Sequence, residues 1–184
     1  MKKLKDILFR VKIDSVYGDT DINISHITFD SRKVKQDGLF IAILGYNLDG
    51  HDYIDQSVKN GAGVVVCEKL PENYKENKIV YVCVKCSKSA LGFIASNFYD
   101  NPSSKIDLVG VTGTNGKTTI SSLLNKLFND LKVKSGLIST INIRYNDFVE
   151  TSNNTTSDPI TMNYHLSEMI KNKLKVCFVE VSSH

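Results

Sequence analysis

A short stretch in the middle of the chain combines glycines, a lysine and hydroxyl side chains at a spacing that suits phosphate binding. Gly113 and Gly116 can adopt positive φ and let the backbone approach a ligand closely, so that successive N–H groups and a helix N-terminus converge on phosphate oxygens. Lys117 would then supply a cation for the terminal phosphates and Thr118 a hydroxyl for Mg²⁺. The stretch departs from the strict P-loop pattern at Val111, where that pattern has glycine. A glycine-rich turn with an incidental lysine is the alternative interpretation.

An acidic residue closes an apolar strand farther along the chain. Glu180 follows the run Val176–Val179 and is the only acid in that strand. A carboxylate at such a strand end, beside a phosphate loop, commonly holds Mg²⁺, so we expect Glu180 to bind metal. A strand-end glutamate that faces solvent is the alternative. His184 follows four residues later, and a surface histidine and a ligand are equally good interpretations of it.

Two further segments carry polar side chains that suit a ligand. Asn153–Thr156 is a loop of amides and hydroxyls, which could hold a polar or phosphorylated substrate, although its composition alone also fits an ordinary loop. Asp30 and Arg32 flank Ser31 just after an early strand. Without more context, such residues form a surface ion pair of little energetic weight.

Strands and helices must position these residues. The run Ile106–Val111 predicts the strand that enters the phosphate loop, and apolar residues at helical spacing over Leu123–Leu131 predict an amphipathic helix that leaves it. Farther on, Asp158 is expected to cap a helix with Pro159 at its first position. The remaining predicted strands of this half, of which the middle two form a hairpin, are Lys134–Ile138, Ile141–Tyr145, Phe148–Thr151 and Lys175–Val181.

The first hundred residues alternate short apolar strands with helical patterns, which predicts a small α/β domain. Ile22–Phe29 is expected to be one strand whose phase slips near His26, as at a bulge. His51–Asn60 is expected to be a helix closed by Gly61. The other expected elements are strands at Leu39–Leu44, Gly63–Cys67 and Ile79–Val84, and a helix with a buried face of Leu91, Ile94, Ala95 and Phe98.

A cluster of turn residues at Asp100–Ser104 predicts the domain boundary, just before the strand that leads to the phosphate loop. The predicted fold class is therefore α/β, with one domain at residues 1–101 and a second at 105–184. The second has fewer strands and covering helices than a parallel ATPase sheet needs. We therefore interpret the chain as a fragment of a longer enzyme.

The composition is that of an ordinary globular protein. Among 184 residues, 23 basic and 20 acidic side chains give a net charge of +3, which is too mild to predict a nucleic-acid partner. No apolar segment approaches the roughly 20 residues of a membrane helix, and no signal-peptide core follows the first lysines, so we expect a cytoplasmic protein. Cys83 and Cys86 have the spacing of half a zinc site, but no second pair complements them, and we interpret the cysteines as structural.

Taken together, these motifs resemble the Mur ligases of peptidoglycan synthesis. The segments that carry the resemblance are Gly113–Thr119, Asp30–Arg32 and Gly45–Asp52. Asn154–Thr156 and the closing Glu180–His184 look most like the MurE type, which adds the third amino acid of the peptide. The resemblance spans nearly the whole chain, and the combination of motifs is specific although each motif alone is not.

The resemblance implies an ATP-driven, ADP-forming amide ligase. Its first domain would be a Rossmann-like α/β domain that holds a uridine nucleotide, and its second the opening part of a P-loop ATPase domain. ATP would phosphorylate the D-glutamate carboxylate of UDP-N-acetylmuramoyl-L-alanyl-D-glutamate, and the amine of free diaminopimelate or lysine would attack the acyl phosphate. The implied cofactors are ATP and Mg²⁺, the implied partners are the UDP-muramoyl dipeptide and a free amino acid, and a monomer without nucleic-acid or membrane partners is expected. Because the C-terminal amino-acid-binding domain lies outside this sequence, we expect the chain alone to be inactive.

The resemblance also implies roles for individual residues. Lys117 and Glu180 would be catalytic, and Thr118 and Glu180 would bind the metal. The triphosphate would be cradled by Gly113, Thr114, Asn115, Gly116, Lys117, Thr118 and Thr119. The UDP-muramoyl peptide would be held by Phe29, Ser31, Tyr46, Asn47, Leu48, Asn154, Thr155, Thr156 and Ser182. The loop at residues 46–48 differs from the histidine-containing version seen in some members of the family.

Three other functions compete with this interpretation. The sister ligase that adds the terminal D-alanyl-D-alanine shares the Asp-Ser-Arg segment and the phosphate loop, but it is not expected to carry the motifs Asn154–Thr156 and Glu180–His184. A non-catalytic module that binds a UDP-sugar or nucleotide would keep the first domain with a vestigial phosphate loop. A P-loop GTPase or kinase would need base-recognition or lid motifs that we do not find.

Overall fold

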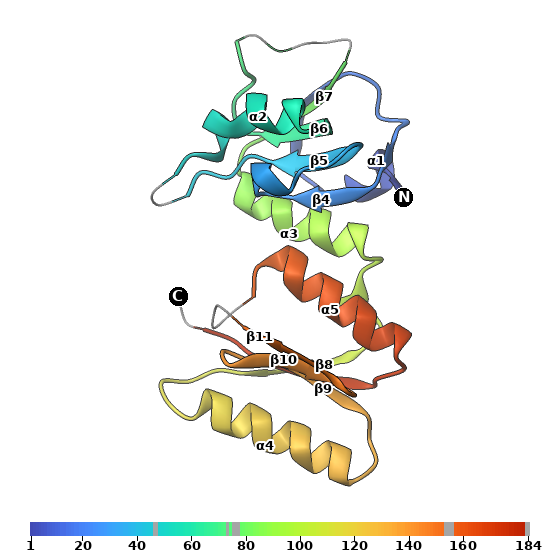
Figure 1. Cartoon of the computed structure of the whole chain (residues 1–184), viewed down its shortest axis with the longest axis vertical. Helices are drawn as coiled ribbons and strands as arrows, with labels where there is room; N and C mark the ends of the chain where they lie inside the picture. The colour runs from blue at the N-terminus through green and yellow to red at the C-terminus, as the bar shows by residue number, and fades with distance from the viewer. Residues whose placement is uncertain (46–47, 73, 75–77, 153–156, 183–184) are drawn as a thin grey trace. The chain divides into compact units, whose positions relative to one another are not determined.

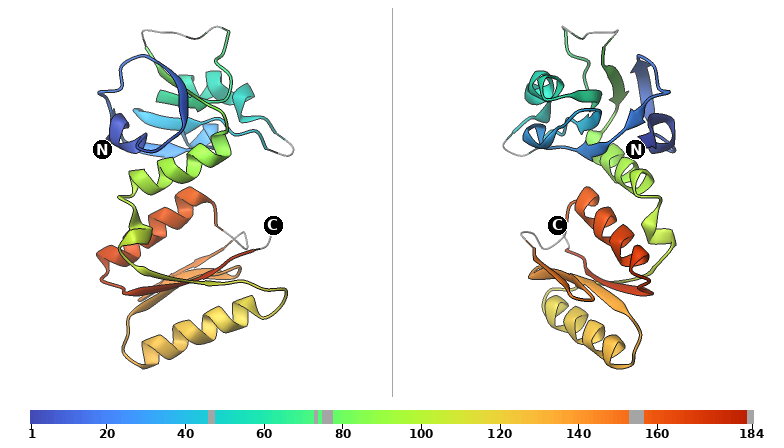
Figure 2. Two further views of the ribbon diagram at one scale, coloured as in Figure 1. Left: turned by 180° about the vertical axis from the view of Figure 1, so that it is seen from behind. Right: turned by 45° about the vertical axis from the view of Figure 1, so that its right-hand side comes forward.

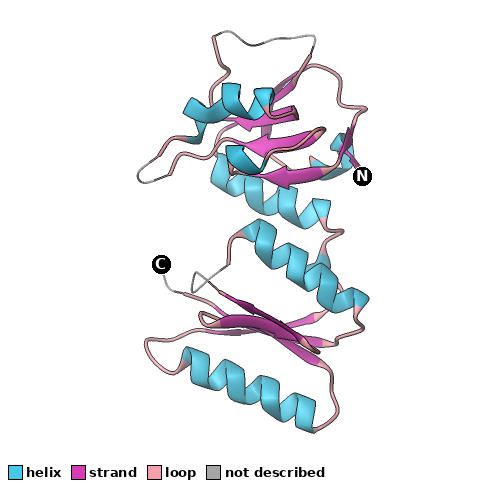
Figure 3. Cartoon of the chain, in the orientation of Figure 1, coloured by secondary structure: helices cyan, strands magenta, loops and turns pink. Residues whose placement is uncertain are grey.

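The computed structural model of the chain describes residues 1–45, 48–72, 74, 78–152 and 157–182. The chain divides into two compact units, Met1–Phe98 and Tyr99–His184, which Figure 1 colours from blue to red along the sequence. Figure 3 shows strands and helices alternating within each of the two units. The predicted α/β class is therefore confirmed.

The first unit is built on a five-stranded sheet in the order β2-β7-β6-β5-β4. The four strands from β4 to β7 are parallel to their neighbours, and β2 pairs antiparallel with β7 at one edge. The strands are Ile13–Tyr17 (β2), His26–Thr28 (β4), Gly38–Ile41 (β5), Ala62–Cys67 (β6) and Val80–Val84 (β7). The helices are Leu4–Ile7 (α1), Ile54–Lys59 (α2) and Ser87–Phe98 (α3), with 3-10 turns at Ser31–Lys33 (η1) and Gly50–Tyr53 (η2).

The central strands of this sheet are apolar along their whole length because helices cover both faces. Every residue of β5 and of β7 is buried, as parallel strands covered on two sides require. On one face Phe40, Val65 and Tyr81 pack with Ile54 of α2, while Figure 2 shows α3 along the other face. The predicted strands β5, β6 and β7 and the predicted helix α3 are confirmed.

The expected continuous strand at Ile22–Phe29 is wrong. Asn23–Ile24 (β3) pairs antiparallel with Lys2–Lys3 (β1) in a separate two-stranded sheet, whereas β4 joins the main sheet beside β5. The chain changes sheets at Ser25, whose backbone N–H donates to the carbonyl of Asp37 at 2.9 Å. The apparent slip in phase therefore marks a crossing between two sheets and not a bulge.

Two further elements differ from expectation. The helix expected at His51–Asn60 begins as the 3-10 turn η2 and becomes α-helical at Ile54. It ends at Lys59, and Gly61 follows its C-cap residue Asn60 with φ of 109°. Such positive φ suits glycine after a helix C-terminus. The edge strand β2 has no counterpart among the expected elements, because its exposed, mixed sequence lacks the apolar run of the central strands.

The second unit has a five-stranded sheet in the order β11-β10-β9-β12-β8. β12 is parallel to both of its neighbours, β8 and β9, while β9, β10 and β11 pair antiparallel. The strands are Asp107–Val111 (β8), Ser135–Ile138 (β9), Asn142–Tyr145 (β10), Phe148–Thr151 (β11) and Val176–Glu180 (β12). The helices are Lys117–Asp130 (α4) and Pro159–Lys171 (α5), with a 3-10 turn at Pro102–Ser104 (η3). All the strands predicted for this half are confirmed.

Two helices cover opposite faces of this sheet, as both views of Figure 2 show. Alternate residues of β12 face each way: Cys177 packs with Leu166 and Met169 of α5, while Phe178 packs against Phe128 of α4 at 5.1 Å between ring centroids. Asp158 accepts from two backbone N–H groups at the start of α5, so the predicted cap is confirmed.

The predicted apolar face of α4 is covered only in part. Leu124 and Phe128 pack on the sheet, but Leu123, Leu127 and Leu131 are 61%, 51% and 65% exposed. The apolar stripe of this helix is therefore wider than the sheet that it covers. Within the part of the chain that the structure describes, no helix has the length and apolar character needed to cross a membrane.

Candidate functional sites

The phosphate loop runs from the carboxyl end of β8 to the first turn of α4. Gly113 has φ of 144° and Gly116 has φ of 79°, values that residues with a Cβ atom rarely adopt. Gly116 is also the N-cap residue of α4, and no side chain caps the helix there. The backbone N–H groups of this helix start are therefore available to an anion, which the helix dipole also favours.

The side chains of the loop surround this helix start. Lys117 begins α4 and its Nζ donates to the carbonyl of Gly113 at 2.7 Å, across the loop. Thr114, Asn115 and Thr119 are exposed, whereas Lys117 and Thr118 are half-buried. The structure thus brings all seven residues predicted for the triphosphate into one strand-loop-helix unit, with a cation and hydroxyls at the helix start.

Glu180 lies at the end of β12, one strand away from the phosphate loop. It pairs in register with Val111, the last residue of β8, and the N–H of Val181 donates to the carbonyl of Val111 at 2.9 Å. The Glu180 side chain is completely buried. The solvent-facing alternative for this residue is therefore wrong.

Two hydroxyl groups hold the buried carboxylate. Thr140, just after β9, donates from Oγ1 to Glu180 Oε2 at 2.6 Å, and Ser121 of α4 donates from Oγ to Oε1 at 3.3 Å. Sequence reasoning missed both hydroxyls. Their only signals were a hydroxyl one helical turn after Thr118 and another directly after a strand end.

No cation of the described residues forms an ion pair with Glu180. A buried carboxylate without a positive partner is costly, so this position favours a bound cation. Mg²⁺ prefers oxygen ligands from carboxylates, hydroxyls and phosphates, and Glu180 together with the Thr118 hydroxyl fits that preference. Among the described residues no three His, Cys, Asp or Glu side chains gather as a metal site of another kind.

The first unit contains a cavity of about 1010 Å³ at one end of its sheet. Three of the residues predicted to hold the UDP-substrate, Phe29, Ser31 and Leu48, line it. Phe29 and Leu48 are 41% and 66% exposed, so apolar surface is available there to a ligand. Other lining residues of differing chemistry are Arg32, Phe40, Gln56, Tyr53, Asp55 and Lys59.

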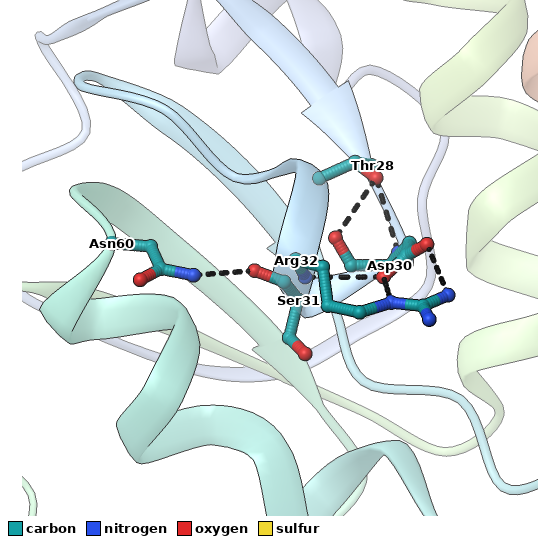
Figure 4. A network of polar contacts seen from close by, with 5 residues as sticks. All are labelled: Thr28, Asp30, Ser31, Arg32 and Asn60. Atoms are coloured by element: carbon teal, nitrogen blue, oxygen red, sulfur yellow. Dashed lines mark hydrogen bonds and ion pairs between the residues drawn. The ribbon is translucent and has the colours of Figure 1, made fainter.

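A polar network fixes the turn that carries Ser31 in this cavity (Figure 4). Arg32 donates from Nε and Nη2 to the two oxygens of Asp30, both at 2.9 Å, and this hydrogen bonding lowers the pKa of Asp30 below its ordinary value. Asn60 donates to the carbonyl of Ser31 at 2.8 Å, while Thr28 Oγ1 accepts from the N–H of Asp30 at 3.0 Å. Ser31 is only 8% exposed, but it lines the cavity and its hydroxyl takes no part in this network.

A second loop, which lines the cavity with Gly45, Leu48 and Gly50, is closed by backbone bonds and a histidine. Gly50 N–H donates to the carbonyl of Ile43 at 2.8 Å, and a Cβ on Gly50 would come within 2.5 Å of the Ile43 nitrogen. His51 bridges Asp49, 2.6 Å from Nδ1, and the N–H of Glu68, 2.9 Å from Nε2. Because Nε2 accepts, the His51 proton lies on Nδ1 and donates to Asp49.

Several predicted site residues lie outside the described residues, namely Tyr46, Asn47, Asn154, Thr155, Thr156 and His184. Ser182 follows β12 by two residues and is half-buried. Cys67, Cys83 and Cys177 are buried, and Cys86 is exposed. Burial raises the pKa of the Cys67 and Cys177 thiols to about 12 in each case, which suits inert structural cysteines.

Comparison with known proteins gives the class to which this arrangement belongs. The model of the Mur ligase family catalytic domain matches residues 23–99, and the model of the Mur ligase middle domain matches residues 111–184. Together the two models match most of the chain. The chain belongs to the Mur ligase family.

Individual relatives narrow the comparison further. The UDP-N-acetylmuramoyl-L-alanyl-D-glutamate--2,6-diaminopimelate ligase of Cytophaga hutchinsonii is 48% identical over 99% of this chain and 37% of its own length. A solved structure of a ligase with the same name covers all of this chain and 37% of its own length. Its TM-score is 0.74 and its sequence identity is 22%. A MurF ligase from Thermotoga maritima, solved in complex with ADP, matches 86% of this chain and 32% of its own with a TM-score of 0.54 at 23% identity. The chain thus spans about a third of the length of these relatives.

Proposed function

We propose that this chain is part of an ATP-dependent ligase that joins 2,6-diaminopimelate to UDP-N-acetylmuramoyl-L-alanyl-D-glutamate. The observation that carries the proposal is the buried carboxylate of Glu180, on the strand next to the one that enters the phosphate loop, with no cationic partner among the described residues. A metal bound with a nucleotide would supply the missing positive charge. The name of the Cytophaga hutchinsonii relative supports diaminopimelate as the amino acid.

At the nucleotide end, the seven residues from Gly113 to Thr119 are proposed to cradle the ATP phosphates. The N–H groups at the start of α4 would bind phosphate oxygens, and Lys117 would exchange its bond with the Gly113 carbonyl for the terminal phosphates. Glu180 and the hydroxyl of Thr118, or of Thr119, would hold Mg²⁺. When bound there, this ion would neutralise charge on the phosphates during transfer.

At the other end, the cavity of the first unit is proposed to hold the uridine nucleotide. Phe29 and Leu48 offer apolar surface to the base, and Ser31 lines the same cavity with a hydroxyl that could bind the nucleotide. Tyr46 and Asn47 are proposed as further contacts to this nucleotide. The muramoyl peptide would be held by Asn154, Thr155, Thr156 and Ser182.

The proposed reaction needs both ATP and the UDP-substrate, because a free carboxylate is a poor electrophile. Phosphorylation of the D-glutamate carboxylate would give an acyl phosphate, which the amine of the amino acid attacks with release of phosphate. The proposed division is a UDP-substrate domain at residues 1–101 and an incomplete ATP-binding domain at 105–184. We propose a monomer that works in the cytoplasm on soluble precursors, and we expect the chain to be inactive without the remainder of the protein.

Binding measurements on the full-length protein test the proposal. We expect the UDP-muramoyl dipeptide and an ATP analogue each to bind, with the analogue dependent on Mg²⁺, and diaminopimelate to start release of phosphate. UDP-muramoyl-dipeptide binding without any ATP binding would favour the non-catalytic module. Turnover of the UDP-muramoyl tripeptide with D-alanyl-D-alanine instead would favour the sister ligase.

A further inference from the structure

Hydroxyl groups hold both oxygens of the Glu180 carboxylate, and each hydroxyl comes from a different element. The bond from Thr140 to Oε2, at 2.6 Å, has the length of a charge-assisted O–H···O⁻ bond, whereas that from Ser121 to Oε1 is longer, at 3.3 Å. A carboxylate has about four lone-pair positions. The two hydroxyls use one position on each oxygen and leave the others for a further partner.

The hydroxyl of Thr140 is presented by a tight turn. Ser139 N–H donates to the carbonyl of Asn142 at 2.9 Å, and the N–H of Asn142 donates back to Ser139 Oγ at 3.2 Å. The turn follows β9, which neighbours β12 in the sheet. The backbone of the turn that carries Thr140 is therefore held by hydrogen bonds that do not involve Glu180.

Ser121 connects the carboxylate to the phosphate loop. It is fully buried on α4, and its Oγ lies 3.2 Å from the carbonyl of Thr118 as well as 3.3 Å from Glu180 Oε1. Since a hydroxyl has one proton, the two acceptors share it. Ser121 thus ties Glu180 to the helical turn that begins with Lys117.

We propose that Thr140 and Ser121 are positioning residues that fix the Glu180 carboxylate for a divalent cation shared with a bound nucleotide. The inference rests on the proposed function, because it takes Glu180 as a ligand of that cation. Neither hydroxyl needs to touch the cation. A glutamate side chain held on both oxygens has already lost the rotamer freedom that metal binding would otherwise remove.

The test uses the full-length protein with Mn²⁺ as a spectroscopic probe and a non-hydrolysable ATP analogue. Thr140→Val keeps the shape of the side chain and removes the hydroxyl, while Thr140→Ser keeps the hydroxyl. Loss of such an outer partner typically weakens metal affinity by about 10- to 100-fold. We expect Thr140→Val to weaken Mn²⁺ binding, measured by electron paramagnetic resonance, by such a factor, and Thr140→Ser to restore it.

Matched variants separate positioning from general destabilisation. Thr151→Val makes the same chemical change on exposed β11, and Ser122→Ala is the neighbour control for Ser121→Ala. We expect Ser121→Ala to weaken Mn²⁺ binding less than Thr140→Val does, because its bond is longer, and both controls to leave it unchanged. UDP-substrate affinity should not change in any of the five variants.

Three outcomes would overturn the inference: unchanged Mn²⁺ affinity in Thr140→Val, no recovery in Thr140→Ser, or an equal loss in Thr151→Val. A lower melting temperature with unchanged Mn²⁺ affinity would show a purely structural role and would also overturn it. If Thr140→Val does not fold, the comparison of Ser121→Ala with Ser122→Ala decides in the same way. Failure of the wild-type protein to bind the Mn²⁺–analogue complex would instead reject the proposed function.

Discussion

The candidate sites of the two units differ in what they offer to a ligand. The first surrounds a cavity with side chains, among them exposed Phe29 and Leu48, whereas the second offers the backbone of a glycine-bearing loop at the start of α4. Apolar walls suit a flat ring, and converging N–H groups suit an anion that has no apolar face. The comparison teaches that each unit should lose its own ligand separately when its site is changed.

The largest effect is expected from Lys117→Ala in the intact protein. Removing one preorganised charge-stabilising group typically lowers turnover by about 10²- to 10³-fold, and we expect at least that loss of phosphate release. Among the residues that the structure describes, the Lys117 side chain donates only to the Gly113 carbonyl within its own loop, so melting temperature and UDP-substrate binding should be unchanged. Unchanged turnover would contradict the proposal that the loop binds ATP, and with it the contrast between the two units.

The converse change in the first unit is Ser31→Leu. A leucine would occupy cavity volume that the ligand needs, and a steric cost of about 1–3 kcal/mol in the complex corresponds to a roughly 5- to 150-fold loss of affinity. We expect the KM for the UDP-substrate to rise accordingly while the KM for ATP changes little. Equal effects on both KM values, or none on either, would mean that the uridine site lies elsewhere.

Two glycines of the first unit allow a test of the loop that contains Gly50 and lines the cavity. A Cβ at Gly50 would meet the backbone of Ile43 at 2.5 Å, whereas a Cβ at Gly92, within α3, would meet nothing within 4 Å. We expect Gly50→Ala to lower the free energy of unfolding by about 1–3 kcal/mol and Gly92→Ala to raise it by roughly 0.5–1 kcal/mol. Denaturant unfolding measures both changes. Only Gly50→Ala should also weaken UDP-substrate binding, and equal weakening by the two variants would contradict the role of the loop.

The smallest effect concerns a second buried titratable group of the second unit. His165 on α5 is 2% exposed among Tyr145, Phe148 and Tyr164, and burial lowers its pKa although Glu150 and two other carboxylates raise it. The folded state then favours the neutral ring. This contribution to stability is present above the ordinary pKa of histidine, near 6.5, and is lost as pH falls through the lower folded value.

We expect the melting temperature of the wild-type protein to fall as the pH is lowered. In His165→Phe the melting temperature should fall less over the same pH range. Each unit by which the folded pKa lies below the unfolded one is worth about 1.4 kcal/mol. Unfolding of wild type and variant is compared from pH 7.5 down to the acid side. The same slope in both proteins would assign the acid sensitivity to other groups.

Most strands and helices were predictable because the sequence pattern of apolar residues indicates which residues are buried. β12 and β7 are continuous apolar runs, and Asp158 with Pro159 marks a helix start by local chemistry alone. The crossing at Ser25 was not predictable, since two short strands in different sheets show the same alternation as one bulged strand. Nor does α4 reveal from its sequence which of its leucines meets the sheet.

The candidate sites were predictable to a different extent. Residue type and spacing predict the phosphate loop and Glu180, but they do not predict Thr140 and Ser121. Each of these hydroxyls reaches Glu180 only because β9, β12 and α4 converge, over separations of 40 and 59 residues. Contacts between such distant positions depend on sheet order, which periodicity along the chain does not encode.

The strand that leads to the phosphate loop has a practical consequence for handling this protein. β8 lies at an edge of its sheet, with Leu108 and Val109 41% and 38% exposed. An apolar edge strand is a template on which another chain can add a strand. In concentrated solutions of this chain alone, β8 should therefore promote self-association, and a charged residue at Leu108 should improve solubility.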